Sequence, residues 1–438
     1  MFESILNRLK DKKILVLGFG REGKSTLRFL YKYLKNNIIG VADKNSSAFV
    51  DAKSQYAELI DSGLLHFHSG DDYLQNIYNY DIVIKTPGIS LKDFNTKNAE
   101  ITSQTDLFLG EFHSQTIGIS GTKGKSTTTS LIYHLLKSVG EDTILTGNIG
   151  IPCFDVMEDI RPKTIVVYEL SAHQLEYVHN GPKVGVLLNV FEEHLDHFGT
   201  FERYKNAKLN LLRFMQKDDS AVVHENLVDD IQSFCAKQIV FSTADFDVDE
   251  NRLLLLGEHN VLNIKASLCA CSSLGIDTKK MIPYLYTFKP LEHRLERVGT
   301  FGGVTFFNDS ISTIPQAAIA ACKTLKKVDF LLLGGFDRDI DYSSLIEFLS
   351  QGIVPHLLFT GKAGDRMMKA LMNRGVKSEL ISYSSMEEAF SYLGANAKAG
   401  DVCLLSPAAS SYDQYKNFEE RGRKFKSLSE KFKVYSKK

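Results

Sequence analysis

The stretch TIGISGTKGKSTTTSLIYHLLKSVG, residues 116–140, combines a short β-branched strand, a glycine-rich turn and a helix-forming segment. Gly121 and Gly124 allow backbone N–H groups to turn toward an anion, and a helix that begins near Ser126 points its positive end there. A strict phosphate-binding loop carries a further glycine five residues before Gly124, where this chain has isoleucine. The terminal Gly-Lys-Ser is intact, so that Lys125 can reach outer phosphates and Ser126 can place its hydroxyl on Mg²⁺. The stretch therefore predicts a nucleoside triphosphate site.

Length and composition place this site in a multidomain enzyme. The chain has 438 residues, of which 43% are hydrophobic, and a formal net charge of −1, which argues against nucleic-acid binding. Six scattered cysteines without a CxxC pair are typical of a reduced protein. The N-terminus lacks the apolar core of a signal peptide, and no apolar run approaches the ~20 residues of a membrane span. We expect a cytoplasmic monomer that binds neither nucleic acid nor membrane.

Three glycine-ended strands divide the chain. Each is followed by helix-like periodicity, which predicts three α/β units with largely parallel sheets. The strands span residues 13–20, 116–124 and 330–339. A proline-containing segment at 290–294 is predicted to be a hinge. The predicted domains are residues 1–104, 105–295 and 296–438.

A polar cluster downstream of the loop offers metal ligands. Glu169 ends the β-branched strand within TIVVYELSAHQLEYV (164–178), where a carboxylate can face phosphates and a metal. A second buried strand begins near residue 184. The polar residues that follow it are Glu192, Glu193, His194, Asp196 and His197. Each of them can be a metal ligand or a structural side chain.

The order Gly-Thr-Lys-Gly-Lys-Ser-Thr (121–127), followed by LNVFEEHLD (188–196) and YKNAK (204–208), resembles the Mur ligase family. These are ATP-dependent, amide-forming enzymes of peptidoglycan assembly, and the resemblance covers nearly the whole chain. It implies a Rossmann-like N-terminal domain, a central ATP-binding domain and a Rossmann-like C-terminal domain. It also implies that Glu169 and His194 hold Mg²⁺, with two metal sites in all. Lys208 would be carbamylated and, in that form, would help to hold the second metal; without the resemblance, it would be an exposed helix lysine.

The resemblance assigns the remaining nucleotide contacts. The residues implied to bind ATP are Gly121, Thr122, Lys123, Gly124, Lys125, Ser126, Thr127, Asn260, Asn263, Arg294 and Asp309. Ser126 would also contact the metal. The residues implied to be catalytic are Lys125, Lys208, His194 and Arg294.

The first glycine-ended strand leads into Gly18, Gly20 and Gly23, a G-x-G-x-x-G pattern, and Asp43 ends the next strand. Taken alone, this pattern indicates a dinucleotide, and hence an NAD-dependent oxidoreductase or a nucleotide sensor. The resemblance instead implies the uridine-diphosphate end of a substrate. The residues implied to bind this substrate are Gly18, Gly20, Asp43, Lys44, Thr86, Pro87, Gly88, Asn148, Ser171 and Gln174.

The stretch LLSPAASSYDQYKNFEERGRKF (404–425) resembles the branch of the family that adds D-glutamate to UDP-N-acetylmuramoyl-L-alanine. The residues implied to bind D-glutamate are Thr313, Arg338, Ser411 and Phe418. Phe418 would otherwise be an ordinary core residue. Ile311 stands where the branch usually has lysine, and Arg338 stands where it often has lysine, so a sister ligase with another amino acid or a folate-type acceptor is the alternative.

Overall fold

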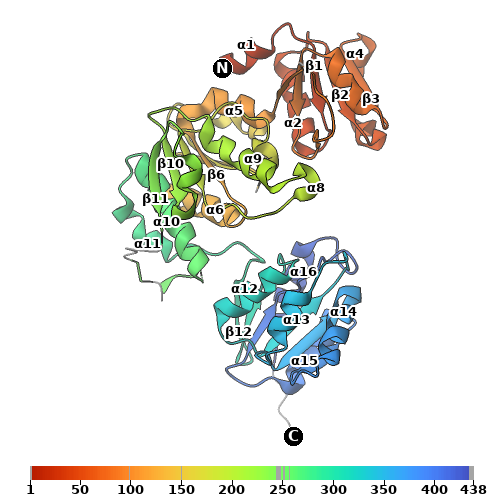
Figure 1. The fold of residues 1–438 in the computed structure, drawn as a ribbon, viewed down its shortest axis with the longest axis vertical. Coiled ribbons are helices and arrows are strands. Elements are labelled where there is room, and N and C mark those ends of the chain that lie inside the picture. The colour runs from red at the N-terminus through yellow and green to blue at the C-terminus, as the bar shows by residue number, and fades with distance from the viewer. Residues whose placement is uncertain are drawn as a thin grey trace. The chain divides into compact units, whose positions relative to one another are not determined.

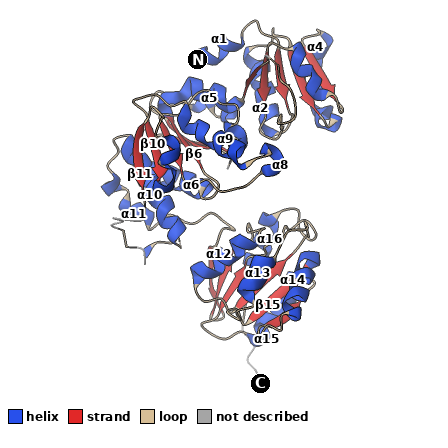
Figure 2. Ribbon diagram, viewed as in Figure 1, coloured by secondary structure: helices blue, strands red, loops and turns tan. Residues whose placement is uncertain are grey.

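The computed structural model describes residues 2–97, 99–148, 150–242, 248–249, 252–255 and 257–433. They form two compact units. The first comprises residues 1–252 and 259–288, and the second comprises residues 253–258 and 289–438. Three separate sheets, two in the first unit and one in the second, are flanked by helices (Figures 1 and 2).

The first sheet is entirely parallel, with the strand order β3-β2-β1-β4-β5. Its strands are β1 (Ile14–Leu17), β2 (Ile39–Asp43), β3 (Leu65–Ser69), β4 (Ile82–Lys85) and β5 (Glu100–Thr102). Its helices are α1 (Glu3–Leu9), α2 (Arg21–Tyr33), α3 (Val50–Gln55) and α4 (Ala57–Asp61). Every residue of the central strand β1 is buried, as its β-branched and leucine composition predicts.

The second sheet is also parallel, with the order β11-β10-β9-β6-β8-β7. Its strands are β6 (Thr116–Ser120), β7 (Thr143–Gly147), β8 (Ile165–Glu169), β9 (Val184–Leu187), β10 (Ser220–His224) and β11 (Lys237–Phe241). The helices of this part are α5 (Gln104–Phe112), α6 (Lys125–Ser138), α7 (Ala172–Leu175), α8 (Leu195–Phe198), α9 (Phe201–Arg213), α10 (Glu258–Ser273) and α11 (Ile282–Leu285). Because β6 lies between β8 and β9, the loops that follow these three strands meet at one sheet edge.

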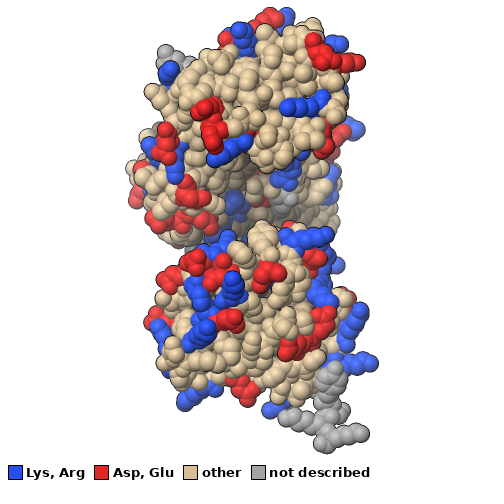
Figure 3. Space-filling view, turned by 90° about the vertical axis from the view of Figure 1, so that its right-hand side faces the viewer, with Lys and Arg blue, Asp and Glu red and all other residues tan. Residues whose placement is uncertain are grey.

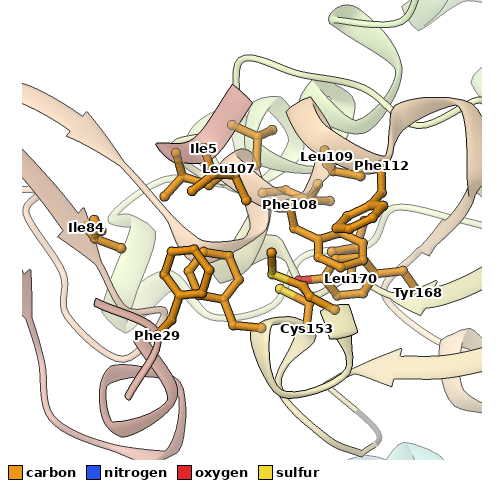
Figure 4. Close-up of a cluster of buried hydrophobic side chains, with 14 of the residues drawn as sticks. Ile5, Phe29, Ile84, Leu107, Phe108, Leu109, Phe112, Cys153, Tyr168 and Leu170 are labelled. Atoms are coloured by element: carbon orange, nitrogen blue, oxygen red, sulfur yellow. The ribbon is translucent and has the colours of Figure 1, made fainter. Parts of the chain in front are cut away.

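One hydrophobic cluster joins the first two sheets. It includes Ile5 of α1, Ile84 of β4, Phe108 of α5 and Tyr168 of β8 (Figure 4). Helix α5 supplies much of the contact, since nearly all of its side chains are buried. The two sheets of the first unit therefore share a core, which explains why they form one compact body.

The third sheet has the order β12-β13-β17-β14-β15-β16, in which only the β12–β13 pair is antiparallel. Its strands are β12 (Glu296–Phe301), β13 (Val304–Asn308), β14 (Phe330–Gly334), β15 (His356–Thr360), β16 (Glu379–Ser382) and β17 (Val402–Leu405). Its helices are α12 (Pro315–Leu325), α13 (Ser343–Leu349), α14 (Gly361–Asn373), α15 (Met386–Asn396) and α16 (Phe418–Glu430). The glycine-ended strands predicted from the sequence are thus β1, β6 and β14, each inside its own sheet. The predicted domain limits at 104/105 and 295/296 stay predictions.

The surface matches the nearly balanced charge of the sequence. Figure 3 shows acidic and basic side chains intermingled on the face that it draws. Within the described part of the chain, every helix is too short or too polar to span a bilayer.

Candidate functional site

The loop between β6 and α6 has the geometry of an anion site. Gly124 has a φ of 88°, a left-handed conformation that favours glycine, and α6 begins at the next residue. A Cβ atom at Gly124 would lie 2.5 Å from Oδ1 of Asn263, so the loop packs closely against α10. The first N–H groups of an α-helix lack intrahelical acceptors, so the start of α6 is a position that suits phosphate oxygens.

Lys125 folds over this loop. Its Nζ atom donates to the carbonyl oxygens of Gly121 at 2.8 Å and of Thr122 at 3.0 Å. The backbone N–H of the neighbouring Lys123 donates to Oδ1 of Asn189 at 2.9 Å, and this hydrogen bond connects the loop to the segment after β9. The loop is therefore held in shape, with a lysine ammonium at its centre. Ser126 is half-buried and Thr127 is buried in the first turn of α6.

Glu169 lies beside the loop at the end of β8, where it pairs with Ile119 of β6. Its side chain is fully buried. Oε1 accepts a hydrogen bond from Nδ2 of Asn148 at 2.9 Å, whereas Oε2 has no hydrogen-bond partner among the described residues. A buried carboxylate oxygen without a partner is costly unless a ligand completes it.

His194 lies in the segment after β9 and precedes α8. Its backbone is left-handed, with φ 58° and ψ 35°. Burial lowers the pKa of His194, and it lowers the pKa of the adjacent His173 to about 4. Both rings are consequently neutral at pH 7, the form in which imidazole binds a cation.

Glu169, Ser126 and His194 carry donor atoms that could hold a magnesium ion together with nucleotide phosphates. The carboxylate of Glu169, the hydroxyl of Ser126 and the imidazole of His194 are a partial donor set, which phosphate oxygens and water would complete. Two of the other metal candidates contact other side chains: Glu193 pairs with Lys123 at 2.6 Å, and His197 bonds Glu176 at 3.1 Å. Within the described ranges, no three His, Cys, Asp or Glu side chains form a metal site by themselves.

Lys208 is not the exposed helix lysine that its sequence context alone would predict. It is 1% exposed, and its Nζ atom donates to the carbonyl oxygen of Gly121 at 2.8 Å. Burial, followed by the positive charges of Lys125 and Lys123, lowers the pKa of Lys208 well below its usual value, although Glu193 opposes this. The site therefore makes the charged ammonium less favourable than it is in water.

Ser171 and Gln174 form a capping box at the start of α7. The Ser171 hydroxyl accepts from the backbone N–H of Gln174, and Oε1 of Gln174 accepts from the backbone N–H of Ser171. Nε2 of Gln174 donates to Oε1 of Glu22 at 2.7 Å. Glu22 lies in α2, next to the glycine loop of the first sheet, so α7 connects that loop with Glu169.

The predicted substrate residues of the first sheet gather at the ends of β1, β2 and β4. A Cβ atom at Gly18 would lie 2.0 Å from Oγ1 of Thr86, so the glycine loop packs directly on the Thr86-Pro87-Gly88 turn. The Thr86 hydroxyl donates to the carbonyl oxygen of Leu17 at 3.0 Å. Gly20 is the N-cap of α2, which leaves this helix N-terminus open to an anion.

Asp43 supports this loop with both carboxylate oxygens. Oδ2 accepts from the backbone N–H of Phe19 at 2.7 Å, and Oδ1 accepts from that of Asn45 at 2.9 Å. Lys44 pairs with Asp71 at 3.4 Å on the surface. Each carboxylate oxygen of Asp43 thus accepts one backbone N–H and keeps a second lone pair for a further donor.

In the second unit, the residues predicted to bind D-glutamate lie in the loops that follow β13, β14 and β17 and at the first position of α16. Nη2 of Arg338 donates to the carbonyl oxygen of Thr313 at 3.3 Å, and Arg338 is otherwise exposed. Ser411 is buried, and Phe418 is half-buried at the first position of α16. Phe418 is therefore not the ordinary core residue that was the alternative. Its ring centroid lies 6.2 Å from that of His293, the neighbour of Arg294.

The remaining nucleotide candidates divide between the units. Asn263 is buried, and its Nδ2 atom donates to Oδ1 of Asn260 at 2.9 Å in the first unit. Asp309 and Arg294 belong to the second unit, where burial raises the pKa of Asp309 to about 6.

Sequence reasoning missed four residues around these sites, namely Glu22, Lys85, Glu176 and Arg421. Arg421 is 4% exposed and donates to the carbonyl oxygens of Ser310 and Ala409, which joins the two loops that precede Thr313 and Ser411. A signal for it was present, since an arginine inside an otherwise amphipathic helix at 418–430 falls on the buried face. No comparable signal marked the other three.

Comparisons with known proteins agree with this arrangement. Residues 119–252 match the family model of the Mur ligase middle domain, and residues 293–409 match the Mur ligase glutamate ligase domain. A UDP-N-acetylmuramoylalanine–D-glutamate ligase from Desulfitobacterium hafniense is 32% identical over 96% of this chain and 98% of its own length. The ligase of the same name from Acetivibrio thermocellus is 30% identical over 96% of this chain and 97% of its own.

Solved structures share the fold at low identity. MurC from Thermotoga maritima, a UDP-N-acetylmuramate-alanine ligase, has a TM-score of 0.57 at 18% identity and covers 94% of this chain and 98% of its own. MurF from the same organism, in complex with ADP, has a TM-score of 0.58 at 19% identity, and the match covers 90% of this chain and 95% of the MurF chain. These likenesses confirm the predicted three-domain α/β fold class.

Proposed function

Because the chain belongs to the Mur ligase family, we propose that it joins D-glutamate to UDP-N-acetylmuramoyl-L-alanine and converts ATP to ADP and phosphate. The observation that carries this proposal is the β6–α6 loop, with Lys125 at its centre, Glu169 beside it and Lys208 buried beneath it. Relatives named for this reaction extend over nearly the whole chain. The activity would serve cytoplasmic peptidoglycan precursor synthesis, and we propose that the enzyme acts as a monomer.

In this proposal, the triphosphate binds the β6–α6 loop, with the backbone N–H groups and the Lys125 ammonium on its oxygens. Asn260 and Asn263 lie beside the loop and would contact the base. Arg294 and Asp309 remain predicted nucleotide contacts. Neutralisation of phosphate charge by Lys125 and Arg294 would favour transfer of the γ-phosphoryl group.

The γ-phosphoryl group would pass to the terminal carboxylate of the L-alanyl substrate. The resulting acyl phosphate has phosphate as a good leaving group. The amine of D-glutamate then attacks the acyl carbon, the new amide bond forms, and phosphate leaves while the amine loses a proton. The task of the protein in both steps is to position the two reactants and exclude water.

Magnesium would be held by Glu169, His194 and Ser126, and when bound it would neutralise charge on the phosphates. The buried, partnerless Oε2 atom of Glu169 supports this assignment. Two metal sites and a carbamate on Lys208 are the finer parts of the proposal. The lowered pKa of Lys208 supports the carbamate, because it is the neutral amine that attacks CO₂ and then releases a proton.

The uridine-diphosphate end would bind the loops of the first sheet, and D-glutamate would bind the second unit. Gly18, Gly20 and the 86–88 turn surround the open N-terminus of α2, which suits a diphosphate. Asn148, Ser171 and Gln174 would line the path to the reacting carboxylate. Arg338, Thr313 and Ser411 would hold the carboxylates of D-glutamate beside Phe418.

Mass spectrometry of the reaction product tests this function. Purified protein with ATP, Mg²⁺, D-glutamate and UDP-N-acetylmuramoyl-L-alanine should yield the substrate plus one glutamyl residue, together with ADP. A parallel titration should show binding of ATP and not of NAD. Tight NAD binding without product would replace the ligase with the oxidoreductase alternative.

A further inference from the structure

The turn that follows β4 makes a second set of contacts, which reach the segment that carries His194. The Ser90 hydroxyl donates to the carbonyl oxygen of His197 at 2.9 Å. The Lys92 ammonium donates to the carbonyl oxygen of Asp196. The turn after β4, a strand of the first sheet, is therefore hydrogen-bonded to α8, which follows β9 of the second sheet.

A second connection between the same two segments is the Lys85–Glu176–His197 relay, in which Glu176 contacts both of the other side chains. Lys85, the last residue of β4, places its Nζ atom 3.0 Å from Oε2 of Glu176. The same oxygen lies 3.1 Å from Nε2 of His197. The side chains of Lys85 and His197 are 2% and 8% exposed, so water competes little for this relay.

The backbone at His194 requires such external support. His194 is a non-glycine residue in the left-handed region, and the helix after it has four residues, too few to be stable alone. The backbone N–H of His197 donates to the carbonyl oxygen of His194 at 3.1 Å, so the position of His197 is transmitted to His194. A strained conformation persists only where its surroundings over-determine it.

We propose that Lys85 is a positioning residue, which acts through Glu176 and His197 to fix His194 in the orientation that meets the metal. Since the same turn contains Thr86, Pro87 and Gly88, binding of the uridine-diphosphate substrate there is coupled to the metal ligand. The metal part of this inference rests on the proposed function, whereas the positioning of His194 does not. Partners that orient a metal ligand typically contribute ten- to a hundredfold to metal affinity.

The test compares Lys85→Met with two matched variants. Lys85→Arg retains the cation and should rescue the effect at least in part. Arg28→Met removes the Arg28–Asp155 ion pair, 2.7 Å long, which joins α2 to a loop of the second-sheet part without touching α7 or α8. Titration with Mn²⁺ in the presence of ADP, followed by electron paramagnetic resonance, should show roughly tenfold weaker binding for Lys85→Met only.

A second readout requires no metal. In metal-free protein labelled at histidine, the ring resonance of His194, assigned with His194→Asn, should shift in Lys85→Met and remain unchanged in Arg28→Met. If Lys85→Met does not fold, Glu176→Gln breaks the same relay and should give the same shift. An unmoved His194 resonance, or an equal change in Arg28→Met, would overturn the positioning role. Failure of the wild-type protein to bind Mn²⁺ would count against the proposed metal site, while the resonance still decides the role of Lys85.

Discussion

Replacing Asp309 by asparagine should make the second unit more stable at neutral pH while it impairs catalysis. Asp309 is 4% exposed and follows β13. Burial raises its pKa from the usual 3.8 to about 6, although hydrogen bonds from Ser312, Ser406 and the backbone of Leu295 oppose the rise, as does the charge of Arg294. Asparagine can keep the acceptor for Leu295 and can donate to Ser406, so that the substitution mainly removes the charge.

The size of the stabilisation by Asp309→Asn follows from the difference between the pKa of Asp309 in the folded state and its usual value in the unfolded state. Because the folded state holds the proton up to about pH 6 and the unfolded state releases it near pH 3.8, stability falls as the pH rises through this window. Above about pH 6 this loss in the free energy of unfolding is complete. It amounts to about 3 kcal/mol, because each unit of difference between the two pKa values is worth about 1.4 kcal/mol. For a unit of this size it corresponds to a difference in melting temperature of about 6–12 °C.

Thermal unfolding of both full-length proteins between pH 4 and pH 8 measures this difference. The melting temperature of Asp309→Asn minus that of the wild type should grow between pH 4 and pH 6 and then level off. Asp341→Asn is the matched control: hydrogen bonds from Ser343 lower the pKa of the exposed Asp341, so its difference should have the opposite sign. A constant difference for Asp309→Asn across the pH range would show that the pKa of Asp309 is not raised in the folded protein.

Three further substitutions test the sites. Lys125→Ala should abolish ADP production while circular dichroism stays unchanged, since Lys125 lies over the phosphate loop; normal turnover would exclude the assignment. Lys208→Ala should be nearly inactive and partly rescued by a short carboxylic acid, and mass spectrometry of wild-type protein in ¹³C-bicarbonate should detect the carbamate; an unmodified amine in active enzyme would disprove it. Arg338→Ala should raise the KM for D-glutamate roughly ten- to a hundredfold and leave that for ATP unchanged, whereas equal increases would indicate a structural arginine.

Much of the fold could be predicted because local composition and topology agree. The buried runs at β1, β6 and β14 are rich in branched residues and end in glycine, so both their type and their interior place in a sheet follow from the sequence. Helix α6 begins at Lys125, which agrees with the predicted start near Ser126; the exact first residue depends on cap geometry. The four-residue helices α7 and α8 are too short to show a period.

The candidate site was predictable where one short stretch carries several of its parts. The β6–α6 loop has its glycines, lysine and serine within seven residues, whereas the burial of Lys208 arises from packing against Gly121, 87 positions away. The Lys85–Glu176–His197 relay likewise joins three distant segments. Such charged residues are expected on the surface until the fold brings their partners together.

Initial rates of ADP release with UDP-N-acetylmuramoyl-L-alanine and a panel of amino acids distinguish a D-glutamate ligase from its sister ligases. The panel should contain D-glutamate, L-glutamate, L-lysine, meso-diaminopimelate, glycine and L-alanine, each with wild-type protein and with Lys125→Ala. D-glutamate should give the highest kcat/KM, the neutral and basic amino acids should be poor substrates, and the variant should be inactive with all of them. Faster ligation of a neutral or basic amino acid than of D-glutamate would contradict the account and assign the chain to a sister branch of the family.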